Sequence, residues 1–317
     1  MVNKVRLFHA VDVHGSEMVW RKWLSIPKVH KADILLLCGD LTGKLIIPII
    51  EESPGRYKTM VYGRWINASG EDELKKLMDK ITFSGFYTHV CNQEEYDELM
   101  KNPKRVDELF RNYMRERLQR WLSMVDEKLS KDVTVVMMPG NDDFQYVDEI
   151  IESSSYVKNL EGKVYDIGER WQLGGTGYSN ITPWKCPRDV PEDELFNRLE
   201  SLAAQVTDMN HFVLHTHCPP YDTKLDQAPQ LDENLKVVYK GGGTMLVPVG
   251  STAVRKFIEK YQFPLGLHGH IHESRAVDRI GKTLVINPGS EYITGTLSAV
   301  LVNLDEKGVK GYRFILT

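Results

Sequence analysis

The segment Gly266-Leu267-His268-Gly269-His270-Ile271-His272-Glu273-Ser274 places two histidines two positions apart, directly after the apolar run 263–267. This run is short, contains a proline and is consistent with a buried strand. Side chains two positions apart in an extended chain point to the same side, so His270 and His272 are expected to converge on one point. Neutral imidazole is the commonest metal ligand in proteins. The pattern therefore predicts a metal site at the end of this strand.

Four further apolar segments lead to polar residues that suit a metal ion. They are Val5–Val11 before Asp12 and His14, Asp33–Cys38 before Asp40, Val133–Met138 before Asn141, and Phe212–Leu214 before His215 and His217. Continuous apolarity is typical of strands buried on both faces of a parallel or mixed sheet. Open α/β sheets gather their chemistry at the carboxyl ends of such strands, so we expect these side chains to meet.

The composition of the chain excludes several classes of protein. Its 317 residues, 42% of them hydrophobic, can bury a large core, and α/β enzymes of this size are often a single domain. The net charge of -4 argues against a protein that coats nucleic acid. The four cysteines are scattered and form no Cys-x-x-Cys, which predicts free thiols in a reducing compartment. Because no signal peptide or membrane span is visible, we expect a cytoplasmic protein.

A long segment separates Asp40 from Asn141, and its pattern predicts a hairpin followed by helices. The hairpin is expected from Leu45–Ile50 and Lys58–Trp65, and the helices over Glu71–Ile81, Gln93–Met100 and, with ~24 residues, Val106–Leu129. We interpret 44–131 as an insertion within a single domain that spans 1–317. The insertion is either a cap or homo-oligomer contact, or a surface elaboration with no role in the site.

The polar face of the last predicted helix carries Arg111, Arg115, Glu116 and Arg120. These residues form either a stripe that faces phosphate or an ordinary solvated face. The interspersed glutamate favours the solvated face.

In chain order, the five strand ends give the blocks Asp12-x-His14, Gly39-Asp40, Gly140-Asn141, His217 and Gly269-His270-x-His272. This ordered set, spanning residues 12 to 272, resembles the pattern of the calcineurin-like metallophosphoesterase superfamily. One Asp-x-His alone would carry no weight, whereas the complete ordered set is specific. The resemblance implies an α/β fold, namely the four-layer α/β/β/α sandwich of two mixed β-sheets known as the metallo-dependent phosphatase fold.

The resemblance also implies two divalent metal ions bridged by Asp40. The implied ligands are Asp12, His14 and His272 for the first ion, and Asn141, His217 and His270 for the second. His217 is preferred to His215 because it stands directly before Cys218-Pro219-Pro220, as the family's ligand does. Since imidazole is abundant, Mn is the first expectation, with Fe, Zn, Co or Ni as alternatives.

Three residues are candidates for a catalytic role beyond the metal ligands. His215 and His268 are expected either to contact the ligands or substrate, or simply to pack. The family's third block commonly continues with a histidine that is credited with protonating the leaving group, and here Asp142 occupies that position. Nearby metal cations are expected to lower the pKa of Asp142, so that it is ionised at neutral pH and unable to donate a proton.

The implied activity is hydrolysis of phosphate esters by in-line attack of a metal-bridging hydroxide, with phosphodiesters favoured because the histidine is missing. We expect a small phosphorylated substrate and neither a nucleic-acid nor a membrane partner. The alternative is a catalytically weak metal-binding scaffold that acts through protein–protein contacts, which the complete ligand set disfavours. The acidic balance and the lack of a basic stripe disfavour a nuclease.

Overall fold

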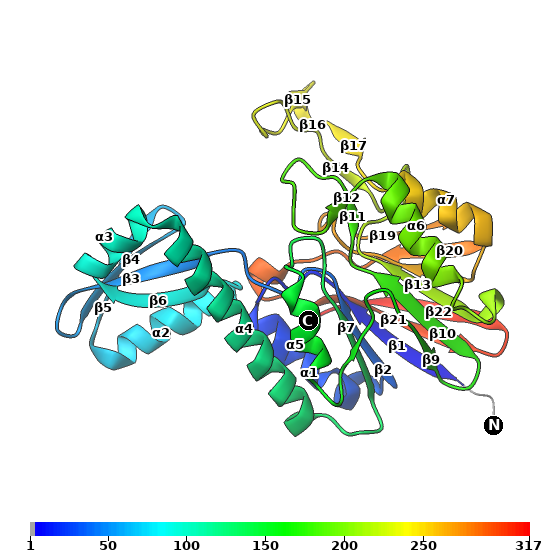
Figure 1. Cartoon of the computed structure of the whole chain (residues 1–317), viewed down its shortest axis with the longest axis horizontal. Helices are drawn as coiled ribbons and strands as arrows, with labels where there is room; N and C mark the ends of the chain where they lie inside the picture. The colour runs from blue at the N-terminus through cyan, green and yellow to red at the C-terminus, as the bar shows by residue number, and fades with distance from the viewer. Residues whose placement is uncertain (1–3) are drawn as a thin grey trace.

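A computed structural model describes residues 4–317 and contains two six-stranded mixed sheets (Figure 1). The first sheet has the order β22-β21-β1-β2-β7-β8. Its strands are β1 (Val5–Ala10), β2 (Ile34–Cys38), β7 (Thr134–Met138), β8 (Lys158–Asn159), β21 (Ser298–Asp305) and β22 (Gly308–Leu316). The strands β1, β2, β7 and β8 are parallel, whereas β21 and β22 pair in antiparallel fashion.

The second sheet has the order β19-β20-β18-β13-β10-β9. Its strands are β9 (Val164–Ile167), β10 (Trp171–Thr176), β13 (Phe212–Thr216), β18 (Leu265–Leu267), β19 (Ala276–Ile280) and β20 (Thr283–Asn287). The four central strands are parallel, and the edge strands β9 and β19 are antiparallel to their neighbours. In both sheets, therefore, the parallel strands end on the same side.

Three apolar clusters divide the sandwich into four layers. One cluster joins the facing sides of the two sheets through residues such as Leu36 and Val213. The outer face of the first sheet packs on α1 (Glu17–His30), α4 (Pro103–Lys128) and α5 (Tyr146–Glu152), and that of the second on α6 (Glu192–Ala203) and α7 (Thr252–Tyr261). The expected α/β sandwich of two mixed sheets is confirmed.

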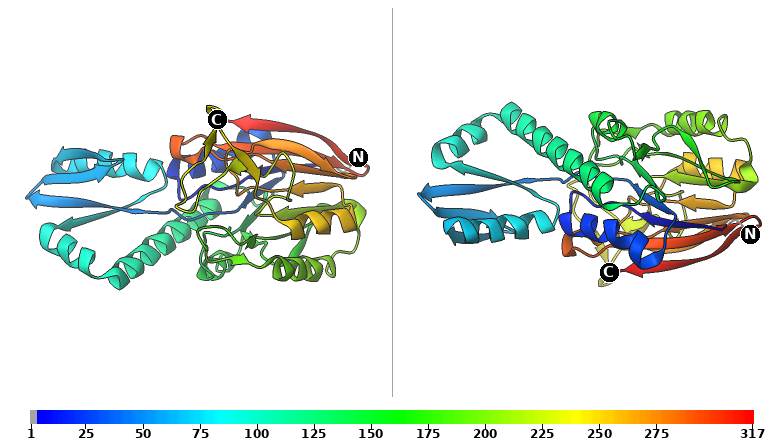
Figure 2. Two further views of the ribbon diagram at one scale, coloured as in Figure 1. Left: turned by 90° about the horizontal axis from the view of Figure 1, so that it is seen from above. Right: turned by 90° about the horizontal axis from the view of Figure 1, so that it is seen from below.

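The segment after Asp40 forms a four-stranded sheet of its own, which projects from the sandwich (Figure 2). Its order is β5-β4-β3-β6. Its elements are β3 (Ile46–Ser53), β4 (Arg56–Val61), β5 (Arg64–Ser69), β6 (Tyr87–Asn92), α2 (Gly70–Phe83) and α3 (Gln93–Lys101). A small core of Ile49, Ala68, Leu77 and Ile81 packs α2 on this sheet. The 44–131 boundary of an insertion stays a prediction.

The predicted strand Lys58–Trp65 was wrong, because a turn divides it. Tyr62 and Gly63 both have left-handed backbone, with φ of 50° and 73°. The chain therefore reverses after β4 and forms a second hairpin with β5. The segment 155–164 contains only the two residues of β8 and the first residue of β9.

Several short elements were not predicted from the sequence. They are β11 (Ser179–Asn180), β12 (Asp189–Val190), β14 (Gln227–Pro229), β15 (Tyr239–Lys240), β16 (Gly243–Thr244), β17 (Leu246–Pro248), η1 (Met209–His211) and η2 (Tyr292–Thr294). Helix α5 and strand β19 were also missed. Among residues 4–317, the structure has no helix that is both long and apolar enough to cross a membrane.

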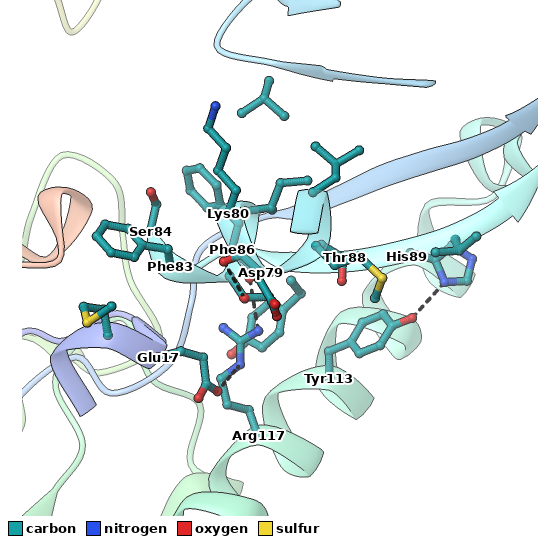
Figure 3. A pocket seen from close by; sticks show the side chains of 18 of the residues that line it. Glu17, Asp79, Lys80, Phe83, Ser84, Phe86, Thr88, His89, Tyr113 and Arg117 are labelled. Atoms are coloured by element: carbon teal, nitrogen blue, oxygen red, sulfur yellow. Dashed lines mark hydrogen bonds and ion pairs between the residues drawn. The ribbon is translucent and has the colours of Figure 1, made fainter. Parts of the chain in front are cut away.

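The root of the segment that follows Asp40 is fastened to the loop after β1. The guanidinium of Arg117, on α4, donates to the carbonyls of Gly15 (2.8 Å), Gly85 (3.1 Å) and Phe86 (3.1 Å). Figure 3 shows Arg117 beside Glu17, with which it pairs at 3.6 Å, in a cleft of about 1730 Å³. Because Arg117 is buried, these bonds hold α4, the start of β6 and the loop that carries His14 as one unit.

Gly85 allows the closest backbone approach at this root. Its φ is +92°, and a Cβ at this position would lie 2.0 Å from the carbonyl oxygen of His14. An L side chain would therefore be strained by the backbone conformation and would also collide with the loop. Glycine meets both requirements.

We predict that Gly85→Ala destabilises the protein more than Gly63→Ala. Both substitutions place a Cβ on left-handed backbone, which costs about 1–2 kcal/mol. At Gly63 a Cβ would meet nothing within 4 Å, whereas at Gly85 it would have to displace the His14 carbonyl. Overpacking of this kind adds about 1–3 kcal/mol. Urea unfolding of the two variants checks the difference, and equal losses of unfolding free energy would contradict it.

Candidate metal centre

The seven predicted metal ligands come together beyond the ends of five strands. In the first sheet, β1 leads to Asp12 and His14, β2 leads to Asp40, and β7 leads to Asn141. In the second sheet, β13 leads to His217, and β18 leads to His270 and His272. Because the parallel strands of both sheets end on the same side, one site receives all seven residues.

The expectation that these pairs lie on extended backbone was wrong. Asp12, His14 and His270 have left-handed backbone, with φ of 53°, 41° and 67°. Such conformations cost about 1–3 kcal/mol each and cluster at functional sites. Here hydrogen bonds between the loops fix them, since the backbone N–H of His14 donates to the Asp40 carbonyl and that of His270 to Asp12 Oδ2, both at 2.9 Å. The ligands therefore converge by turning, and not by strand alternation.

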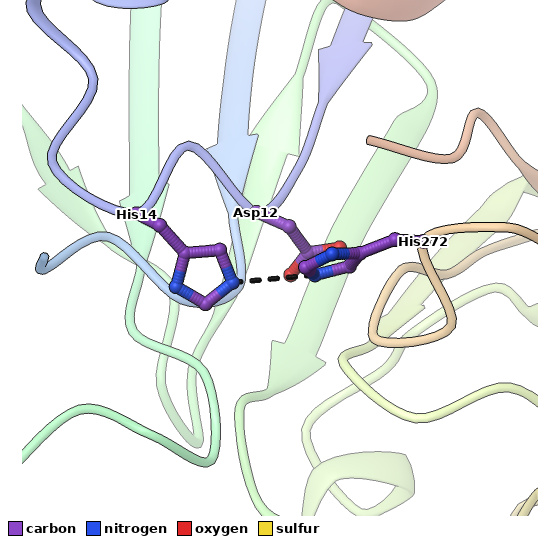
Figure 4. A group of neighbouring side chains, drawn as sticks. All are labelled: Asp12, His14 and His272. Carbon is purple, nitrogen blue, oxygen red and sulfur yellow. Dashed lines mark hydrogen bonds between the residues drawn. The ribbon is translucent and has the colours of Figure 1, made fainter. Parts of the chain in front are cut away.

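The first group consists of Asp12, His14 and His272, shown in Figure 4. The Nε2 atoms of His14 and His272 face each other at 3.2 Å. The ring of Tyr292 lies 4.6 Å from that of His14 and covers this side of the group. Two imidazoles and a carboxylate thus point to one place.

The second group consists of Asn141, His217 and His270. His217 Nε2 lies 2.9 Å from Asn141 Oδ1 and 3.2 Å from His270 Nδ1. Asp40 lies between the two groups, with Oδ2 3.5 Å from His14 Nε2 and Oδ1 3.4 Å from His217 Nε2. One carboxylate therefore directs one oxygen to each group.

Burial and mutual charge set the protonation of the centre in the metal-free protein. Burial raises the pKa of Asp12 to about 7, with His217 opposing it. Burial also disfavours ionised Asp40, but His217 and His14 outweigh it and hold the pKa of Asp40 well below its usual value. Burial disfavours charged His217, yet Asp40 and Asp12 outweigh it and raise the pKa of His217 to about 9. Without a metal, His217 therefore carries the positive charge that balances these carboxylates.

The donors fit divalent cations. Burial lowers the pKa of His270 to about 3 and that of His272 to about 4, and it lowers the pKa of His14 well below its usual value. These rings are thus neutral at pH 7, the form that binds metals. Asp12 Oδ1 is buried without a hydrogen-bond partner in the part of the chain that the structure describes. Paired imidazole nitrogens beside a buried carboxylate oxygen that makes no hydrogen bond within residues 4–317 form a donor set that a cation would satisfy.

Known proteins resemble this chain in sequence and in fold. No family model matches the chain. The uncharacterised protein MJ1162 of Methanocaldococcus jannaschii is 34% identical over 182 residues, which cover 56% of this chain and 75% of that protein. The chain belongs to the same family as this relative. Its five blocks, which meet at one site, resemble the pattern of the calcineurin-like metallophosphoesterase superfamily.

Two solved crystal structures share the fold of this chain along its whole length. One has a TM-score of 0.57 at 15% identity, and TT1561 of Thermus thermophilus has a TM-score of 0.53 at 12% identity. Each comparison covers 100% of this chain and 99% of the other. At such identities the likeness shows the fold alone.

Lys44 lies at the edge of the candidate centre and was not identified from the sequence. Its Nζ lies 2.7 Å from Asp142 Oδ2, and 45% of its side chain is exposed. Burial disfavours charged Lys44, but Asp142 and Asp40 outweigh it and raise its pKa. No motif marks a lone lysine four positions after Asp40, so only the fold could identify it.

The expected lowering of the pKa of Asp142 is not seen in the metal-free protein. Burial and the nearby Asp40 raise the pKa of Asp142, while Lys44 opposes them. The Sγ of Cys186 also donates to Asp142 Oδ1 at 2.9 Å. Asp142 is thus held by an ion pair and a thiol hydrogen bond at the edge of the centre.

His215 and His268 lie behind the centre with no exposed surface. The His215 ring packs edge-on against His9 at 5.0 Å, and His268 Nδ1 lies 2.9 Å from Thr216 Oγ1. Burial lowers the pKa of His268 to about 3 and that of His215 well below its usual value. Both rings are therefore neutral and enclosed, a placement that favours packing over contact with substrate.

Asp143 joins two of the ligand loops and was also missed. It is fully buried and accepts hydrogen bonds from the N–H groups of Leu41 (2.8 Å), Thr42 (3.0 Å) and Gly140 (2.9 Å). Since Leu41 follows Asp40 and Gly140 precedes Asn141, one carboxylate fixes the spacing between these two ligands.

We predict that metal binding to the metal-free protein releases about one to two protons at pH 7. With a pKa of about 9, His217 is protonated at pH 7 and must become neutral to bind a cation, and Asp12, with a pKa of about 7, is about half protonated. The apparent affinity for Mn²⁺ should therefore rise about tenfold per pH unit from pH 7 towards pH 9. Calorimetric titration in buffers of different protonation enthalpy measures the release, and an affinity that is constant over this range would contradict the prediction.

Proposed function

We propose that this chain hydrolyses phosphate esters with two divalent cations, Mn²⁺ preferred, and favours phosphodiesters. The observation that supports this most is Asp40, whose two oxygens face two separate groups of buried donors. A pair of cations in such a centre acts as a Lewis acid on the phosphoryl oxygens and supplies a nucleophile at neutral pH.

Lys44 supplies a positive charge at the open side of the centre. Its raised pKa keeps it protonated at neutral pH, and its side chain is partly exposed beside the centre. An ammonium placed where negative charge gathers on phosphorus stabilises the transition state more than the ground state. We therefore assign Lys44 to binding a non-bridging phosphate oxygen.

A cavity beside His272 is a candidate place for part of a small substrate. A cavity of about 430 Å³ is lined by His272, Arg275, Ser290 and Glu291. This volume falls within the usual range for small-molecule sites, about 300–1,000 Å³. The much larger cleft at the root of the projecting sheet contains none of the seven donors, whereas the smaller cavity contains His272. We therefore place at the smaller cavity the part of the substrate that lies away from Lys44.

The preference for diesters rests on the missing proton donor. An alkyl monoester has a poor leaving group, and a general acid typically accelerates its loss by ~10²–10⁴-fold. Asp142 is engaged by Lys44 as an ion pair and so offers an acceptor, not a proton. A negative charge on Asp142 would also repel a dianionic monoester more than a monoanionic diester, but Lys44 neutralises that charge. The preference for diesters therefore rests on the lack of a proton donor alone.

One experiment distinguishes the proposed phosphoesterase from the alternative, a catalytically weak metal-binding scaffold. Hydrolysis of bis-p-nitrophenyl phosphate should vanish with a chelator and return with Mn²⁺ more than with Ca²⁺, which prefers all-oxygen sites. We predict that Asp40→Asn lowers kcat by more than ~100-fold, since losing even a residue behind the ligands typically costs ~10–100-fold. The control is Asp166→Asn, the same change at an exposed position. Full activity in the chelated protein would refute the proposal.

We predict that Asp142→His raises activity on an alkyl monoester relative to a diester by at least ~10-fold. An imidazole at this position can donate a proton to the leaving group, which a poor leaving group needs most. The ratio of the two kcat/KM values, compared between wild type and variant, measures the effect. The idea fails if the ratio is unchanged, or if the wild type already prefers the alkyl monoester.

A further inference from the structure

The amide of Asn141 can serve a cation in only one of its two orientations. Its Oδ1 is a metal ligand, whereas its Nδ2 carries two hydrogens and would repel a cation. In the structure Oδ1 lies 2.9 Å from His217 Nε2 and therefore faces the centre. The two orientations have nearly the same shape, so the choice between them depends on hydrogen bonding around Nδ2.

Asp189, at the start of β12, lies against the Nδ2 atom of Asn141. Asn141 Nδ2 donates to Asp189 Oδ1 at 2.8 Å. The second oxygen, Oδ2, accepts from Thr182 N (2.9 Å), Thr182 Oγ1 (2.5 Å) and Cys186 N (3.0 Å). With three donors on Oδ2, the carboxylate cannot rotate freely and presents an acceptor to Asn141. An acceptor at this point is compatible only with the orientation that turns Oδ1 to the centre.

The neighbouring Arg188 holds the same two segments together. Its backbone N–H donates to the Asn141 carbonyl at 3.1 Å, and its Nε donates to the Asp143 carbonyl at 2.9 Å. The Arg188 side chain is fully buried. The Asp189 carboxylate is therefore fixed in position relative to the Asn141 backbone.

We propose that Asp189 is a positioning residue, which fixes the amide of Asn141 with its oxygen towards the second cation. The inference rests on the proposed function in one respect, namely that Asn141 binds a cation. It assigns a role to the loop from Thr182 to Asp189, which none of the five sequence blocks includes. Residues that hydrogen-bond a metal ligand in this way typically contribute ~10–100-fold to metal affinity.

The substitution Asp189→Asn replaces the acceptor that faces Asn141 with a donor, while the shape of the side chain stays nearly the same. The three donors from Thr182 and Cys186 still require an oxygen, so the new amide nitrogen must face position 141. Asn141 would then turn its oxygen to that nitrogen and its Nδ2 to the centre. Adding Asn141→Asp provides an oxygen on both sides and conserves the total charge of the wild type.

The test is calorimetric titration of the metal-free proteins with Mn²⁺. We expect wild type to bind two ions, and Asp189→Asn to bind one of them ~10–100-fold more weakly. The double variant Asn141→Asp/Asp189→Asn should recover most of this loss, a coupling expected only of residues in direct contact. Asp166→Asn serves as the surface control, and the thermal midpoint of each variant is recorded without metal.

The Mn²⁺ affinities and thermal midpoints of these variants distinguish a positioning role of Asp189 from a purely structural one. If Asp189→Asn lowers the thermal midpoint but leaves both Mn²⁺ affinities unchanged, the residue is merely structural and the proposal is overturned. If Asp189→Asn does not fold, recovery of folding and of two sites in the double variant supports the proposal, and failure of the double variant rejects it. If Asn141→Asp alone binds Mn²⁺ more tightly than wild type, added charge explains the recovery and the proposal falls. A wild type that binds no Mn²⁺ refutes the proposed function itself.

Discussion

The ion pair of Asp40 with protonated His217 is the interaction on which the site of the metal-free protein depends. A buried carboxylate is costly unless charges and hydrogen bonds compensate it. Here it lies between His14 and His217, which come from different sheets, and it accepts the Asp142 N–H at 3.0 Å. The facing sheets, the inter-loop bonds and Asp143 all hold the partners of this one group. The arrangement of two sheets that meet at the ends of their strands is therefore also the arrangement that keeps Asp40 charged.

Much of the sandwich could be predicted because its strands are short apolar runs that end in polar residues. The segment Ile34–Cys38 is buried along its whole length, which is why pattern alone located it. The ordered blocks also identified seven residues that the structure brings together. The reason given for their convergence was wrong, since the turns at Asp12, His14 and His270 depend on bonds between distant loops, which no local spacing encodes.

Residues that act through single long-range contacts escaped prediction. Lys44 and Asp189 lie 98 and 48 positions from Asp142 and Asn141, the residues they contact, and neither belongs to a motif. The second hairpin was missed because its turn, Tyr62-Gly63, lies within an apolar stretch that reads as a continuous strand. In each case the deciding information is a tertiary contact or a single backbone conformation, whereas sequence patterns report periodicity and burial.

Helix α4 has a consequence for how this chain could be shortened. Its first part belongs to the projecting sheet, yet its later residues Leu118, Trp121 and Val125 are core residues of the sandwich, and the Trp121 ring stacks on Trp20 at 4.5 Å. Arg117, between these parts, ties down the loop of His14. The segment between the second and third blocks is thus not a detachable module. A shortened chain with a linker in place of this segment would lose the core residues of α4. It would also lose the hydrogen bond from Arg117 that holds the loop of the predicted ligand His14.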